Sequence, residues 1–113
     1  MKMIMAIIHH EDEMDTVRCL NEQNFFVTKL STTGGFLKGK NTTIMIGTED
    51  ERVDDAVNVI RENAGKRRAI RYDNSGNLTG GSYTGINMPV PLEVEVGGCT
   101  IFEFPIDRIE RCV

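Results

Sequence analysis

The run that decides the fold reads Met3-Ile4-Met5-Ala6-Ile7-Ile8. Every position in this run is apolar, which is typical of a strand that is covered on both faces and lies at the centre of its sheet. The run is far shorter than the roughly 20 apolar residues of a membrane span, and no small-residue cleavage pattern follows it. We therefore predict a central strand, and neither a membrane span nor a signal peptide.

Two amphipathic segments predict helices that cover one face of this sheet. Residues 11–23 begin with acidic side chains, which suit the positive end of a helix dipole, and then place apolar side chains at helical spacing. The second helix follows Thr48-Glu49-Asp50-Glu51, which has the form of a capping box. Its apolar stripe is made by Val53, Ala56, Val57 and Ile60. The other face of the central strand is also apolar, so we expect a second subunit to cover it.

Four further segments have the composition of strands. They are residues 25–31, 41–47, 92–96 and 100–104. The last two flank Gly97-Gly98 and are expected to pair as a hairpin, with one short helical turn over 106–111 after Pro105. The order β-α-β-β-α-β with an added C-terminal strand is the split βαβ arrangement of a ferredoxin-like α+β domain. A length of 113 residues leaves room for one such domain, spanning 1–113.

Composition narrows the function classes. Apolar residues make up 40% of the chain and charged residues 27%, which is an ordinary globular balance. The net charge of −4 disfavours general DNA or RNA binding, because such binding relies on Lys and Arg. Cys19, Cys99 and Cys112 lack the spacing of a metal site. We expect free thiols in a reducing cytosol, and hence a cytoplasmic protein.

No residue pattern in the chain is typical of a catalytic or metal site. His9 and His10 are neighbours on a strand, so their side chains point to opposite faces and cannot easily share a metal ion. The start of a helix explains the acidic residues 11–13, and Cys99 has no recognisable histidine partner. We predict no enzyme, no catalytic residues, no metal and no cofactor.

Two connections have unusual length or chemistry. Residues 65–91 exceed the about 12 to 15 residues usual for a loop, and they are rich in Arg and Gly. They indicate either a flexible, solvated loop or one that responds to a ligand or partner. In residues 32–40, Thr32-Thr33-Gly34-Gly35 offers hydroxyls and backbone N–H groups for an anion, and Phe36-Leu37 offers apolar surface for a base. This stretch predicts either a site for a phosphorylated purine or a plain hairpin loop.

Several elements follow one another in a fixed order along nearly the whole chain. They are Asn24-Phe25-Phe26-Val27-Thr28-Lys29-Leu30-Ser31-Thr32-Thr33-Gly34-Gly35-Phe36-Leu37-Lys38, then Asn41-Thr42-Thr43, Met45-Ile46-Gly47 and Glu93-Val94-Glu95-Val96-Gly97-Gly98-Cys99-Thr100-Ile101-Phe102. This composite pattern resembles the PII-like cyclic-di-AMP receptor family.

The resemblance implies a cytosolic signalling homotrimer that binds a cyclic dinucleotide, cyclic-di-AMP, in clefts between subunits. It also implies a loop change that signals to an unidentified protein partner. Matched by position, the ligand-binding residues are Asn24, Phe26, Thr28, Gly34, Gly35, Phe36, Leu37, Asn41, Gly47, Phe102 and Arg108. Strand alternation independently predicts that Asn24, Phe26 and Thr28 share one face. Ligand binding is expected to order part of residues 65–91.

One position departs from the family pattern, because the family usually has Arg where this chain has Phe26. Phenylalanine keeps stacking on a base but loses the pairing with phosphate. The loss is expected to weaken binding by roughly 1.5 to 3 kcal/mol unless another cation substitutes. Lys29 projects to the opposite face of the strand, whereas Arg108 or an arginine of 65–91 is a candidate substitute.

Two alternative functions stay open from the sequence. One is a PII-like trimer that binds another nucleotide or only a protein partner. The other is a divalent-metal-binding trimer of the cation-tolerance type, which shares the ferredoxin-like ring.

Overall fold

The computed structural model describes residues 1–30, 41–73 and 90–113. Their contacts divide the chain into two compact units: Met1–Lys66 with Gly97–Val113, and Arg67–Val96. The prediction of a single domain stays a prediction, because this division concerns contacts and not independent folding.

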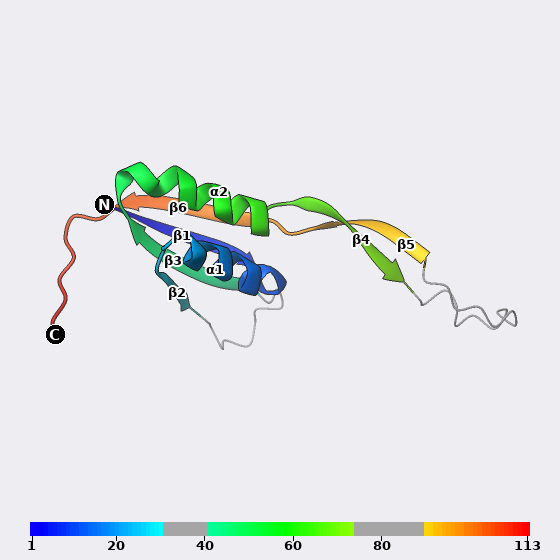
Figure 1. The fold of residues 1–113 in the computed structure, drawn as a ribbon, viewed down its shortest axis with the longest axis horizontal. Coiled ribbons are helices and arrows are strands. Elements are labelled where there is room, and N and C mark those ends of the chain that lie inside the picture. The colour runs from blue at the N-terminus through cyan, green and yellow to red at the C-terminus, as the bar shows by residue number, and fades with distance from the viewer. Residues whose placement is uncertain (31–40, 74–89) are drawn as a thin grey trace, which may run out of the picture. The chain divides into compact units, whose positions relative to one another are not determined.

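The first unit is built on a four-stranded antiparallel sheet in the order β2-β3-β1-β6 (Figure 1). The strands are β1 (Lys2–His9), β2 (Val27–Leu30), β3 (Asn41–Thr48) and β6 (Cys99–Pro105). The apolar strand β1 is central, as its composition predicted. Together with two helices in the crossovers, this order is consistent with the predicted ferredoxin-like arrangement.

Both predicted helices are present. A 3-10 turn (His10–Asp12) leads into α1 (Glu13–Glu22), and a second one (Asp50–Arg52) leads into α2 (Val53–Ala64). The expected capping box at α2 is wrong in detail, since the capping residues of the turn and of the helix are Glu49 and Arg52 and neither makes a side-chain capping hydrogen bond. The extra turn displaces the helix start beyond the capping sequence.

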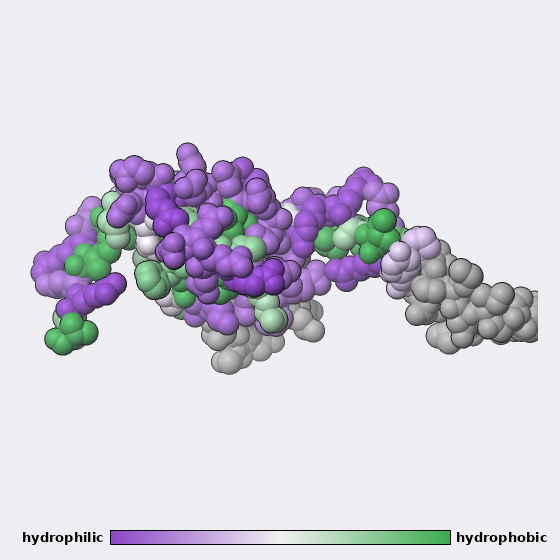
Figure 2. Space-filling model, viewed as in Figure 1, coloured by the Kyte–Doolittle hydropathy of each residue, from purple (hydrophilic) through white to green (hydrophobic). Residues whose placement is uncertain are grey.

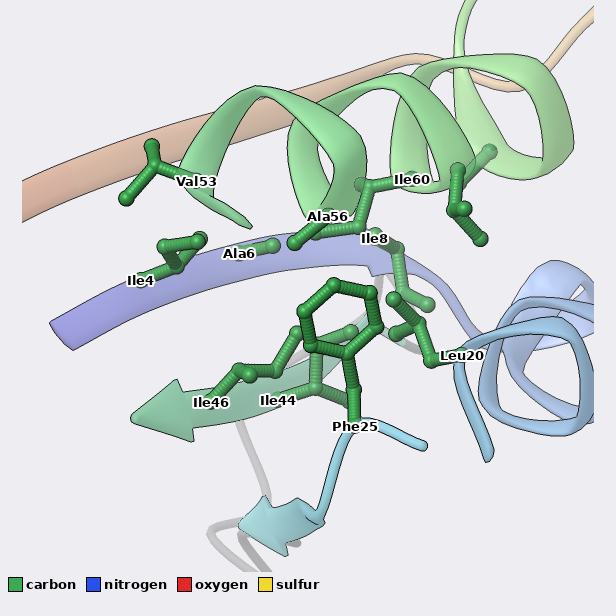
Figure 3. Close-up of a cluster of buried hydrophobic side chains, with 12 residues drawn as sticks. Ile4, Ala6, Ile8, Leu20, Phe25, Ile44, Ile46, Val53, Ala56 and Ile60 are labelled. Carbon is green, nitrogen blue, oxygen red and sulfur yellow. The ribbon is translucent and has the colours of Figure 1, made fainter. Parts of the chain in front are cut away.

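The core lies between the helices and one face of the sheet (Figure 3). Alternate positions of β1 and β3 are buried there against apolar side chains of α1, α2 and the turn that follows α1. These side chains include Ile4, Ala6, Ile8, Ile44, Ile46, Leu20, Phe25, Val53, Ala56 and Ile60. Burying each of the larger ones contributes about 1.5–3 kcal/mol. The outer surface of the two helices is largely hydrophilic (Figure 2). Each helix therefore packs on the sheet with one face and exposes the other to solvent.

The predicted hairpin of 92–96 with 100–104 is wrong. Strand β5 (Val90–Val96) pairs with β4 (Arg67–Asp73), whereas β6 pairs with β1. Gly97 and Gly98 have φ angles of 82° and 125°, and they form a connection instead of a tight turn. Strand β6 is thus the fourth strand of the core sheet, and the additional strands precede it in sequence instead of following it.

The second unit is the two-stranded antiparallel sheet of β4 and β5. The Arg68 guanidinium lies 3.2 Å from the Glu93 carboxylate across this pair. Ile70, Tyr72 and Leu92 are exposed on it, and Figure 2 shows apolar surface there. The expectation of a loop over 65–91 is therefore wrong for 67–73 and for 90–91, which belong to β4 and β5, while 74–89 lie outside the described residues. The arginines of β4 interrupt any apolar pattern that would have indicated a strand.

The helical turn expected over residues 106–111 is also wrong, since the described chain has no helix there. The Ile106 N–H donates to the Met1 carbonyl at 3.1 Å. This bond continues the pairing beside β1 beyond Pro105 and favours extended backbone over a helical start.

Gly65 ends α2 where a side chain has no room. A Cβ at this position would lie 2.4 Å from the Arg61 carbonyl oxygen, which accepts the Gly65 N–H at 2.9 Å. Gly65→Ala is expected to lower the free energy of unfolding by about 1–3 kcal/mol, because helix backbone must shift. Urea denaturation measures this loss, with Glu62→Ala on the exposed side of α2 as the control. Equal midpoints for the two variants would contradict the close approach.

Candidate functional site

The face of the sheet opposite the helices carries a row of side chains that crosses all four strands. The strand register places Thr28 beside Met45, Met45 beside Met5, and Met5 beside Phe102. Neighbouring strands lie about 4.8 Å apart, so the row spans about 14 Å. Met5 and Met45 are half-buried at its centre, whereas Thr28 and Phe102 are exposed at its ends. The row is an apolar strip with a hydroxyl at one end and an aromatic ring at the other.

Asn41 and Gly47 lie on this same open face, near the two ends of β3. Asn41 pairs with His9 and Gly47 pairs with Met3. The six-residue separation corresponds to about 20 Å along the strand. Together with the cross-strand row, the predicted residues spread over an area on the order of 14 by 20 Å. One subunit therefore presents them as a broad surface instead of a single small pocket.

Three other predicted residues lie outside the strands of this sheet. Asn24 has a φ of 68° in the turn after α1, and β2 begins only at Val27. The alternation argument is thus wrong for Asn24, because it needs extended backbone. Phe26 is 88% exposed just before β2. Arg108 lies beyond β6 and pairs with Glu110 at 2.6 Å.

The remaining predicted residues, Gly34, Gly35, Phe36 and Leu37, lie outside the described residues.

A pocket of about 460 Å³ opens at the end of the sheet where β1 stops and β3 and β6 begin. It is lined by Ile7, His9, Asn41, Gly65, Lys66, Gly98, Cys99 and Thr100. An imidazole, an ammonium, an amide and a hydroxyl there suit a polar or anionic group. Burial raises the pKa of the Cys99 thiol, so the thiol is a neutral lining group. Of these residues the sequence predicted only Asn41 as ligand-binding, because the pairing of distant strands and the end of α2 bring the others together.

A polar cluster lies on the helix side of the same strands. The Thr42 hydroxyl donates to Glu13 Oε1 at 2.9 Å, and Lys29 Nζ donates to Glu13 Oε2 at 3.3 Å. His10 Nδ1 lies 3.3 Å from the Thr42 hydroxyl oxygen. The Thr42 hydrogen bond, aided by Lys29, lowers the pKa of the Glu13 carboxyl although burial opposes this. The contact with α1 confirms that Lys29 projects away from the Thr28 face.

A contact of Arg52 holds the turn before Phe26. The Arg52 guanidinium lies 4.1 Å from the centroid of the Phe25 ring and donates to the Gln23 carbonyl at 2.6 Å. Phe25 is only 3% exposed, so it anchors the turn in the core while Phe26 points outward. This cation–π contact joins the 3-10 turn before α2 to the turn before β2.

The described ranges contain neither a metal-binding cluster nor a membrane-spanning helix. No group of three or more His, Cys, Asp or Glu side chains there could hold a metal ion. None of the helices in those ranges is both long and apolar enough to cross a membrane.

The fold and its open face define a ferredoxin-like α+β domain that presents polar and aromatic side chains on the sheet face opposite its helices. The model of the cyclic-di-AMP receptor family matches residues 1–112, and the chain belongs to that family. This match confirms the resemblance seen in the sequence. The chain is also similar to a protein of known structure from Pediococcus pentosaceus ATCC 25745, described as functionally unknown. The two are 35% identical over 98% of this chain and 96% of the other, with a TM-score of 0.72.

Proposed function

We propose that this protein is a non-enzymatic cytosolic receptor that binds cyclic-di-AMP between the subunits of a homotrimer. The family match supports the ligand class. The observation that carries the location is the register, which places Thr28 and Phe102 in one row, with Asn41 and Gly47 on the same face. Hydroxyl and amide groups bind phosphate and base edges, and an aromatic ring stacks on a base.

The spread of these residues favours a site shared between subunits. Met5 and Met45, half-buried at the centre of the open face, leave apolar surface exposed. Covering such surface is favourable by about 25 cal/mol per Å². A neighbouring subunit on this face would cover the methionines and bring a second set of contacts toward the first. The ligand then lies in the cleft where the two subunits meet.

In this proposal the receptor acts through a change in the segment between α2 and β6. A ligand shifts such an equilibrium only by its different affinity for the two states. Hydrogen exchange over residues 65–91 is expected to slow on saturation with cyclic-di-AMP, and a protein partner would read the ordered form. Equal exchange with and without ligand would overturn this part of the proposal.

Isothermal titration calorimetry tests the binding proposal. Cyclic-di-AMP is expected to bind, whereas ATP, ADP, copper and zinc serve as the comparison ligands. Heat from ATP or ADP alone would favour a receptor for another nucleotide, and heat from the metals alone would favour a cation-handling trimer. The absence of cyclic-di-AMP heat at high micromolar concentration would overturn the proposal.

The departure at Phe26 gives a prediction of increased affinity. Phe26→Arg restores a side chain that pairs with phosphate and still stacks on a base. It is expected to tighten cyclic-di-AMP binding by about 1.5–3 kcal/mol, or about 10- to 150-fold. Phe26 is 88% exposed, so the fold should tolerate the change.

Met14→Arg is the matched control for charge, because Met14 is 81% exposed on α1. The control is expected to leave the titration unchanged. Unchanged or weaker binding by Phe26→Arg would show that this position does not face the ligand phosphates.

A further inference from the structure

Glu13, the first residue of α1, joins two strands that are separated in sequence by residues 31–40. One carboxylate oxygen accepts from Thr42 on β3 at 2.9 Å, and the other accepts from Lys29 on β2 at 3.3 Å. Its side chain is 17% exposed. Both carboxylate oxygens of Glu13 therefore accept hydrogen bonds in a mostly buried position. One oxygen contacts β3 and the other contacts β2.

The location of this bridge along the ladder is informative. The last described pair of β2 with β3 is Leu30 with Thr43. Lys29 pairs with Ile44, and Thr42 lies two residues before Ile44 on the same face of β3, so Glu13 joins neighbouring side chains of the two strands.

Strand alternation connects the bridge to the open face. Successive side chains of a strand point to opposite faces, so Thr28 and Asn41 project away from the helices where Lys29 and Thr42 project toward them. Glu13 thus holds the immediate chain neighbours of two residues in the candidate site. Fixing Lys29 and Thr42 fixes the backbone from which Thr28 and Asn41 project.

The electrostatics favour a charged bridge at neutral pH. The Thr42 hydrogen bond is the main cause of the lowered pKa of Glu13, and Lys29 adds to it through a hydrogen bond and its charge. Hydrogen bonds to an ionised carboxylate are shorter and stronger than neutral ones. The Thr42 contact at 2.9 Å is the firmer half of the bridge, and the half-exposed Lys29 at 3.3 Å adds to it.

We propose that Glu13 is a positioning residue for the ligand site: it sets the spacing of Thr28 and Asn41 across the sheet without touching the ligand. This inference rests on the proposed function for its effect on affinity. The bridge itself is independent of any ligand.

Charge exchange tests the bridge in the full-length protein. Glu13→Lys is expected to weaken cyclic-di-AMP binding by about 10-fold or more, since it places two ammonium groups together and moves both strands. Glu13→Lys combined with Lys29→Glu restores opposite charges and should recover most of the affinity. The exchange also restores the net charge, so Glu13→Lys combined with Arg18→Glu, which has the same net charge without opposite charges at the bridge, is the matched control and should recover no affinity. Asp15→Asn is the control, because Asp15 pairs only with exposed Arg18 among the described ion pairs, at 3.2 Å.

A second measurement on the ligand-free protein separates this inference from the proposed function. The Thr28 and Asn41 backbone amides should shift in NMR spectra of Glu13→Gln and stay in place in Asp15→Asn. Unshifted amides would overturn the positioning role even if cyclic-di-AMP binds. Shifted amides in a protein that binds no cyclic-di-AMP would support the bridge and overturn the proposed function alone. Equal affinities for Glu13→Lys and the wild type would also overturn the positioning role.

Discussion

Replacing Ile60 with alanine is expected to lower the free energy of unfolding by about 2–5 kcal/mol, the usual cost of such a change in a packed core. Ile60 is 0% exposed and faces the sheet from α2. The change removes apolar contacts and leaves a cavity that rigid helix and sheet backbones cannot close. Small domains have total stabilities of about 5–15 kcal/mol, so this single change removes a large share.

Urea denaturation followed by circular dichroism measures the loss. Ile60→Val is the graded control and should cost only about 0.5–1.5 kcal/mol. A loss for Ile60→Ala no larger than that for Ile60→Val would contradict the packing between α2 and the sheet.

Met5→Arg is expected to convert the proposed trimer to monomers and to abolish cyclic-di-AMP binding. Met5 lies half-buried between Met45 and Phe102 at the centre of the open face. The proposed trimer buries this face, so arginine would place an unpaired charge in the interface at a cost of about 3–5 kcal/mol. That cost corresponds to more than about 100-fold in the association constant.

Light scattering after size-exclusion chromatography measures the mass of the assembly. Met14→Arg makes the same substitution on the exposed surface of α1 and should leave the mass unchanged. If Met5→Arg kept the mass and the affinity of the wild type, the open face would not be the subunit interface.

Local periodicity accounts for the parts of the fold that the sequence predicts well. An unbroken apolar run identified β1 as central, and the stripe ending at Ile60 identified α2. Both patterns arise from the burial of side chains within a single helix or strand, so they can be recognised in one continuous stretch of sequence. The same reasoning separated the faces of Thr28 and Lys29 correctly, because alternation is fixed once a strand is assumed.

Pairing between distant segments could not be predicted in the same way. The pair Gly97-Gly98 is typical of a tight turn, but the neighbouring strands bond to β4 and β1 instead. Which strand pairs with which depends on the whole sheet. The prediction that Asn24 shares a strand face with Thr28 is wrong for a local reason. Asn24 has a left-handed backbone conformation in the turn that ends α1, so it is not part of a strand.

The Glu13 bridge escaped sequence reasoning because an acidic residue at a helix start already has an electrostatic explanation. Only the three-dimensional structure brings Lys29 and Thr42 to it. The family pattern contains both of these residues, yet the structure places them on the face away from the candidate site.

The hydrogen bond from the Gly98 N–H to the Ala64 carbonyl, at 2.9 Å, has a consequence for how such a protein can diversify. It closes the chain within the four-stranded unit just before the backbone departs at Lys66 and just after it returns at Gly97. The second unit, Arg67–Val96, is therefore attached to the four-stranded unit at two points that this hydrogen bond holds close together. A segment of different length between these two points is therefore expected to leave the strand pairing of the four-stranded unit unchanged.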